Sequence, residues 1–258
     1  MIMPIGDDNT GRTIRPWVTY ALIAANVLVF FLFQGGGTNE EFTYSFSCVP
    51  REIVTGNDEV TPPKEVEVPP GQTVTVPGLG RTPGSVYFTL LTSMFMHGGI
   101  AHLFGNMLFL WIFGDNVEDS HNHWRYLIFY LVCGLVASLA HVFTTVAFYG
   151  ANSEQALIPS LGASGAISGI MGGYLVLHPQ RRVMVFLFRM VTHVPAYVAI
   201  GMWFLFQVIS SLGAFGEGSQ TGGVAYAAHI GGFLAGLVLA RLFAAGRPDS
   251  GGRMRERS

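Results

Sequence analysis

Six apolar runs separated by polar segments divide the chain. They cover residues 17–34, 99–113, 124–147, 162–177, 194–213 and 226–244. A helix rises about 1.5 Å per residue, so a run of about 20 apolar residues crosses the roughly 30 Å hydrocarbon core of a bilayer. The run at 162–177 is short for a full crossing, which is typical of a helix that other helices shield from lipid. The pattern predicts an all-α membrane protein with six transmembrane helices.

The longest polar segment, residues 35–86, follows the first apolar run. Its section at 62–70 alternates valine with glutamate between prolines, which predicts a short extended arm or hairpin. A loop of this length usually carries function or lacks order. We therefore expect a long, partly ordered first loop. The expected parts of the chain are an N-terminal segment (1–16), a six-helix domain (17–245) and an Arg-rich tail (246–258).

Basic residues predict how the helices are oriented. If the N-terminus is cytoplasmic, only three of the 14 basic residues fall in outer loops, namely Arg51, Lys64 and Arg81. This distribution follows the positive-inside rule, so both termini are expected in the cytoplasm and the first loop outside it. The tail at 253–258 either contacts anionic lipid head groups or is disordered.

Composition agrees with a bilayer as the main partner of the chain. Charged residues make up 12% of the sequence, against roughly 25% in soluble domains, and the mean hydropathy is +0.43. The net charge of −2 gives no electrostatic support for a nucleic-acid partner. Cys48 lies in a polar loop and Cys133 in an apolar run, so neither a metal site nor a disulfide is expected from them.

Polar residues gather at one depth in the predicted bundle. The second, fourth and sixth helices all descend from the outer face, so their first turns lie at the same level. These turns contain His97, His102 and Asn106 on the second helix, Ser164 on the fourth and His229 on the sixth. Ionisable groups inside a membrane cost several kcal/mol unless they are paired, and they often mark functional sites.

Small residues predict that the fourth and sixth helices approach closely. Glycines spaced four residues apart follow each of the two polar residues. They are Gly165, Gly169 and Gly173 after Ser164, and Gly232 and Gly236 after His229. Such stripes let helix backbones touch, which would bring Ser164 within hydrogen-bond reach of His229. A neutral imidazole can then accept the serine proton and return it to a leaving amine. The alternatives are a helix-capping serine and a histidine that only packs against a neighbouring helix.

His102 and Asn106 are four residues apart and project from one helix face. Together with the backbone N–H of Ser164 they could stabilise a developing oxyanion. The alternative is a hydrogen bond between helices that has no catalytic task. His97 is weighed equally as a structural residue and as support for the site.

No carboxylate is available to complete a catalytic triad. The nearest acidic residues, Asp115, Glu118 and Asp119, lie about 20 Å below His102 by helical rise. The sequence therefore favours a Ser–His dyad.

Three motifs in order, His102-Leu-Phe-Gly-Asn106, Gly162-Ala-Ser-Gly165 and Ala228-His229-Ile-Gly-Gly232, resemble the rhomboid family of intramembrane serine proteases over residues 85–245. The resemblance implies a six-helix rhomboid bundle that cleaves single-span membrane proteins near the outer face, without metal or cofactor. It implies Ser164 as nucleophile, His229 as general base, and His102, Asn106 and the Ser164 amide as the oxyanion hole. It also implies that Glu118 ties neighbouring segments together.

The chain departs from the family pattern in two places. The first loop lacks the Trp-Arg pair of many rhomboids, and residues 54–84 look like an insertion. Members also commonly place an aromatic residue one turn after the nucleophile, where this chain has Ser168. We therefore expect His229 to be oriented in another way, with Ser168 as a candidate. Gly162, Ser168 and His97 complete the supporting residues of the predicted site.

Substrate access and competing functions follow from the same residues. The helix at 193–212 and the glycine-rich 213–223 loop have the composition of a movable gate. The alternative is that they are ordinary lipid-facing aromatics and a flexible loop.

Three other functions compete with the serine-protease interpretation. They are a metal protease using His97, His102 and His229, an inactive rhomboid-like protein, and a transporter. The compact six-span form indicates a multi-pass protein of a bacterial cell membrane, with the site open to the extracytoplasmic side.

Overall fold

The computed structural model describes residues 3–68, 72–187, 190–214 and 223–244. Each of the six predicted apolar runs forms a helix over most of its length. Their helices are α1 (Trp17–Leu28, continued by a π-helical turn over Val29–Phe33), α5 (Ile100–His121), α6 (His123–Tyr149), α7 (Ser164–Leu177), α8 (Ala196–Ala214) and α9 (Gly223–Phe243). Arg189, most of the 213–223 loop and the Arg-rich tail lie outside the described residues.

Not every apolar helix is long enough to cross a membrane by itself. Among the described residues, two helices are long and apolar enough to cross a membrane alone, namely His123–Tyr149 and Tyr226–Phe243. A third span would be the pair Val86–Phe95 and Ile100–His121, which is bent by 79°. The other apolar helices are shorter and cover Trp17–Phe33, Ser164–Leu177 and Ala196–Ser211. The six helices are thus confirmed, whereas six crossings stay a prediction.

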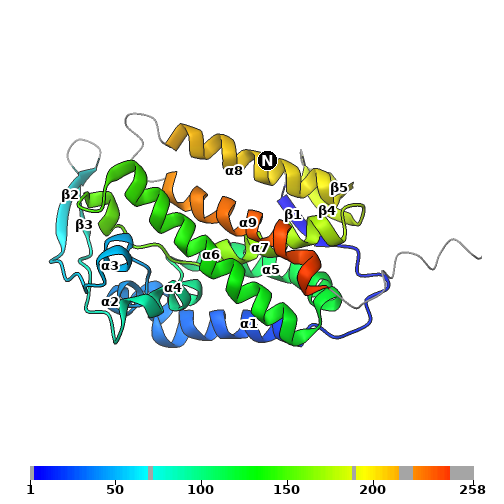
Figure 1. Cartoon of the computed structure of the whole chain (residues 1–258), viewed down its shortest axis with the longest axis horizontal. Helices are drawn as coiled ribbons and strands as arrows, with labels where there is room; N and C mark the ends of the chain where they lie inside the picture. The colour runs from blue at the N-terminus through cyan, green and yellow to red at the C-terminus, as the bar shows by residue number, and fades with distance from the viewer. Residues whose placement is uncertain (1–2, 69–71, 188–189, 215–222, 245–258) are drawn as a thin grey trace, which may run out of the picture.

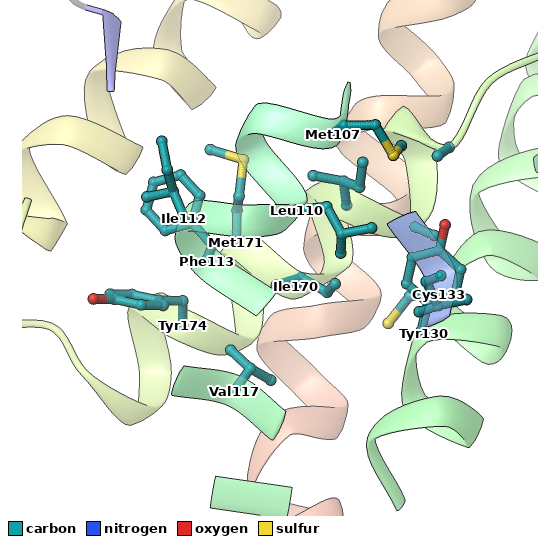
Figure 2. Close-up of a cluster of buried hydrophobic side chains, with 14 of the residues drawn as sticks. Met107, Leu110, Ile112, Phe113, Val117, Tyr130, Cys133, Ile170, Met171 and Tyr174 are labelled. Carbon is teal, nitrogen blue, oxygen red and sulfur yellow. The ribbon is translucent and has the colours of Figure 1, made fainter. Parts of the chain in front are cut away.

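Helix α7 occupies the centre of the bundle (Figure 1). It packs against α5, α6 and α9, while α1 packs on α5 and α8 packs on α9, so that α1 and α8 run along opposite edges. Figure 2 shows the apolar core around α7, in which Ile170, Met171 and Tyr174 lie among side chains of α5 and α6. The Tyr174 ring meets Phe113 edge-on, with the ring centroids 5.2 Å apart. The predicted short fourth helix is therefore shielded on most sides by other helices.

The predicted first loop contains several short elements. They are α2 (Glu40–Ser45), α3 (Pro50–Thr55), β2 (Lys64–Val68) and β3 (Gln72–Val76), and α4 (Thr89–Thr92) follows the loop. Strands β2 and β3 pair antiparallel at one end of the molecule (Figure 1). Cys48 and Ser160 exchange backbone hydrogen bonds of 2.9 and 2.8 Å. This bridge fixes the first loop beside the segment that leads into α7.

A three-stranded sheet at the opposite end of the molecule corrects the all-α class. Strands β1 (Met3–Asp7), β4 (Arg182–Leu187) and β5 (Met190–Pro195) pair antiparallel in the order β1-β4-β5 (Figure 1). The N-terminal segment is therefore attached to the bundle through β4. Helix α8 begins at Ala196, because His193 and Val194, which were expected in the helix, belong to β5.

Polar contacts hold the N-terminal strand against the helices. The Asp7 carboxylate accepts hydrogen bonds of 2.7 Å from the Tyr174 hydroxyl and 2.6 Å from the Asn116 amide. The Arg181 guanidinium donates to the backbone oxygen of Asp8 at 2.8 Å. These contacts join the strand to α5, α7 and the start of β4, so the strand is part of the folded domain.

Glu118 joins three helices at this end. Its fully buried carboxylate accepts the backbone N–H groups of Val18 and Thr19 at 2.9 and 2.8 Å, and it contacts His123 Nδ1 at 2.5 Å. Asn122 turns the chain between α5 and α6 with a φ of 66°, a conformation that asparagine tolerates better than most residues. The expected tying role of Glu118 is thus confirmed.

Candidate active site

Ser164 is the first residue of α7, and the backbone before it is unusual. Gly162 adopts a φ of 119°, which favours glycine, and its N–H donates to the Ser93 carbonyl at 2.8 Å. A Cβ on Gly162 would lie 2.8 Å from the ring of His102. Because the first N–H groups of a helix have no partner within it, the Ser164 amide is available at the site. A side chain at 162, two residues before Ser164, would therefore collide with the His102 ring.

The hydroxyl of Ser164 donates to Nε2 of His229 on α9 at 2.8 Å. Glycines make this approach possible. A Cβ on Gly232 would collide with the carbonyl oxygen of Gly165, and a Cβ on Gly236 would collide with that of Gly169. The two backbones are therefore in direct contact, as the spacing of four predicts.

The glycine stripe of α7 faces both α6 and α9. Gly165 and Gly169 contact both α6 and α9, through Ala137 and Cys133 of α6 and backbone oxygens of α9. Gly173 faces Phe129 of α6 and Ala240 of α9, and Gly172 beside it faces the backbone of α9. Side chains at these positions would separate α7 from its neighbours and displace Ser164.

His102 and Asn106 face the same site from α5. The backbone N–H of Gly98 donates to His102 Nδ1 at 3.4 Å, which leaves the ring proton on Nε2, and a Cβ on Gly162 would lie 2.8 Å from this Nε2. Asn106 is 7% exposed, and its Nδ2 has no hydrogen-bond partner among the described residues. A buried amide without a partner is costly unless a ligand satisfies it. Both side chains can therefore donate to an anion beside Ser164.

The other two supporting residues take less direct positions. His97 is buried behind His102, with the two rings edge-on and their centroids 5.2 Å apart, and it does not line the cavity at the site. The Ser168 hydroxyl donates to the Ser164 carbonyl at 2.6 Å. A serine inside a helix readily bonds the carbonyl four residues back, so the expected orientation of His229 by Ser168 is not what the structure shows.

Gln207 of α8 is the contact that the sequence reasoning missed. Its Oε1 accepts a hydrogen bond from Nδ1 of His229 at 2.8 Å. Gln207 is the only amide side chain in the apolar run at 194–213. A polar residue in such a run is the signal that could have identified it.

A cavity of about 280 Å³ opens at these residues, between α5, α7, α8 and α9. Its lining includes Ser164 and His229, the two α5 donors His102 and Asn106, and Trp203 and Gln207 on α8. Most of the remaining lining is apolar or small, which suits an extended, weakly polar segment. In the described part of the chain, no three His, Cys, Asp or Glu side chains are grouped as metal ligands.

Known proteins match this chain over most of its length. The family model described as Rhomboid domain matches residues 84–246. Rhomboid protease GluP of Bacillus subtilis is 30% identical over 92% of this chain and 36% of its own length. Rhomboid protein 1, mitochondrial, of Saccharomyces cerevisiae is 30% identical over 58% of this chain and 40% of its own length.

A human relative, Presenilin-associated rhomboid-like protein, mitochondrial, is 27% identical over 40% of this chain and 26% of its own length. The alignments thus span about a quarter to two fifths of the relatives' own lengths. The matched region of the family model contains the cavity and the residues from His102 to His229 that line it. The chain belongs to the rhomboid family.

Proposed function

We propose that this chain is an intramembrane serine endopeptidase that cleaves membrane-protein substrates within or next to their transmembrane segments. The observation that carries the proposal is the 2.8 Å hydrogen bond from the Ser164 hydroxyl to His229 Nε2, at the wall of a cavity between helices. One relative whose name describes it as a protease, Rhomboid protease GluP, supports the same activity.

The geometry supports hydrolysis in two stages. Ser164 Oγ attacks the scissile carbonyl carbon while its proton passes to His229 Nε2, and the carbonyl oxygen becomes an oxyanion. As the intermediate collapses, the C–N bond breaks and His229 returns the proton to the leaving amine. Water then attacks the acyl-enzyme, giving a proton to His229, and the second collapse releases the acid and restores Ser164 Oγ–H.

Three donors converge where the oxyanion would form. They are His102 Nε2–H, Asn106 Nδ2–H and the Ser164 backbone N–H at the start of α7. Removing one such donor typically lowers kcat by about 10²–10³-fold. The unpartnered buried amide of Asn106 supports this role, because a transition-state oxygen would satisfy it.

Water and substrate need separate routes to the dyad. A second cavity of about 40 Å³ lies against Ser164 and His229, and serines 93, 138 and 160 line it. A site of this size holds a water molecule, for which roughly 10–15 Å³ suffices.

The larger cavity lies between α5 and α8, so a substrate segment would reach Ser164 sideways between these helices. It must unwind there, since a helix hides its carbonyls in hydrogen bonds.

The proposal includes the topology predicted from charge. With both termini in the cytoplasm, 1–16 and 246–258 are cytoplasmic segments and 17–245 crosses a bacterial inner membrane six times. The first loop then lies outside, and the cavity opens toward that face. The Cys48–Ser160 bridge supports this arrangement, since it joins the first loop to the segment that precedes Ser164.

A cleavage assay tests the proposal. The purified chain in liposomes is incubated with a single-span substrate whose outer half contains helix-weakening glycine, in parallel with Ser164→Ala and His229→Ala. We expect wild type to cleave the substrate with and without a chelator, and both variants to lose at least a thousandfold in rate. Cleavage that persists in Ser164→Ala, or that stops with the chelator, would refute the serine mechanism.

A further inference from the structure

A dyad without a carboxylate needs another way to hold its histidine. His229 must present the lone pair of Nε2 to Ser164, so the ring proton has to stay on Nδ1. In triads a carboxylate accepts this proton's hydrogen bond, and losing the correct tautomer costs about 10⁴-fold in rate. The question is which group performs this task here.

In the described part of the chain, the hydrogen-bond partner of His229 Nδ1 is Gln207, whose Oε1 lies 2.8 Å away. No other described residue forms a hydrogen bond with this nitrogen. The Ser168 hydroxyl is directed to the Ser164 carbonyl. The rings of Trp203 and Tyr226 lie with their centroids 6.1 and 6.4 Å from that of His229, so they limit the ring's tilt only.

The position of Gln207 on α8 is hard to explain by packing. The side chain is 7% exposed, whereas its neighbours Leu205, Phe206 and Ile209 are more than half exposed, as lipid-facing residues would be. Burying an amide in an apolar setting is unfavourable unless it is hydrogen-bonded. An apolar side chain would therefore pack better at 207, and the contact with His229 accounts for the glutamine.

We propose, on the basis of the serine-protease function above, that Gln207 is a positioning residue that fixes His229 in its reactive tautomer and orientation. The amide oxygen accepts the Nδ1 proton, and Nε2 is left free to accept the proton of Ser164. A neutral amide does this without placing a negative charge inside the bilayer, where a carboxylate would be costly.

The same contact links the general base to a wall of the substrate cavity. Gln207 and Trp203 lie one turn apart on α8, and both line the cavity. Helix α8 is held on α9 by the stacked rings of Phe204 and Phe233, whose centroids are 4.2 Å apart. The orientation of His229 therefore depends on how α8 sits against α9.

Two substitutions at 207 separate positioning from packing. Methionine matches the length of glutamine and has no strong acceptor, whereas in glutamate a carboxyl oxygen accepts from Nδ1 in either protonation state. If Gln207 only fills space, Gln207→Met retains activity and Gln207→Glu loses it, because a charge is buried. If Gln207 positions His229, the order is reversed.

The experiment measures kcat, KM and the Tm of both variants in liposomes or detergent, with Ser211→Ala as control. Ser211 lies one turn further along α8, equally buried, and its hydroxyl donates to the Val208 carbonyl. We expect Gln207→Met to lose about 100-fold in kcat with KM within threefold of wild type. Gln207→Glu should stay within tenfold of wild type, and Ser211→Ala should be unchanged.

The inference is overturned if Gln207→Met retains kcat within threefold, or if Gln207→Glu is slower than Gln207→Met. If the methionine variant does not fold, Gln207→Asn replaces it. The asparagine side chain is one methylene shorter, so its amide oxygen lies too far from His229 Nδ1, and the same loss in kcat is expected. Ser164→Ala is assayed in parallel. An inactive Ser164→Ala with a fully active Gln207→Met refutes only the positioning role, whereas an active Ser164→Ala refutes the proposed function itself.

Discussion

Replacing Gly232 with alanine tests whether backbone contact between α7 and α9 creates the dyad. The new Cβ would collide with the carbonyl oxygen of Gly165. Carbon and carbonyl oxygen approach to about 3.3 Å in close contacts, so the helices must separate by about 1 Å. The hydrogen bond from Ser164 Oγ to His229 Nε2, now 2.8 Å, would lengthen beyond hydrogen-bond distance.

The expected loss follows from that displacement. A misplacement of about 1 Å can lower a rate by about 10²-fold, which corresponds to about 2.7 kcal/mol in the activation barrier. The assay compares kcat for a transmembrane substrate in wild type and Gly232→Ala, together with the Tm of each protein. The matched control is Gly201→Ala on α8, because a Cβ there meets nothing within 4 Å. We expect the control to retain wild-type activity.

One result would refute this reasoning. If Gly232→Ala folds with an unchanged Tm and cleaves within threefold of the wild-type rate, the close approach of α7 and α9 does not set the distance between Ser164 and His229. The glycine stripes would then serve only to pack the bundle.

Three further predictions address other parts of the molecule. Gly162→Ala should lower kcat by about 10²–10³-fold, because the φ of 119° disfavours alanine and the new Cβ meets the His102 ring; a rate within twofold of wild type would contradict this. Glu118→Ala should lower the free energy of unfolding by about 3–5 kcal/mol, because backbone donors of α1 lose a buried acceptor. The loss should appear as a fall in Tm that the exposed control Glu65→Ala does not show. Burial raises the pKa of the Glu52 carboxyl in the first loop to about 7, so the folded chain holds this proton more tightly than the unfolded chain. The free energy of unfolding should therefore fall by up to about 3 kcal/mol as the pH rises from about 4.5 to about 7, and the Tm should fall with it. Glu52→Gln should reduce this fall in Tm. An equal fall in both proteins would exclude Glu52 as its source.

Local patterns explain what the sequence could predict. The apolar runs predict the helices because the side chains of each run are either buried in the bundle or exposed to lipid. The contact between Ser164 and His229 could be predicted because glycines at a spacing of four follow both residues on their own helices. These signals depend on neighbouring residues within one helix and need no knowledge of the rest of the fold.

The missed features depend on residues far apart in the chain. Strand β1 pairs with β4 across about 180 residues, so that Met3 lies opposite Phe186, and no local pattern in the N-terminal segment requires that partner. The contact between Gln207 and His229 depends on how α8 is rotated against α9, which the apolar run at 194–213 does not determine. The Ser168 bond to the Ser164 carbonyl, by contrast, is local and could have been predicted.

The most direct test of the central claim is to find which atom reacts with a fluorophosphonate. The purified protein is labelled and digested, and the adduct is located by mass spectrometry. We predict one adduct on Ser164, which forms at least a hundredfold more slowly in His229→Ala. An adduct on another residue, or labelling of Ser164 at the wild-type rate without His229, would contradict the claim that these two side chains act together.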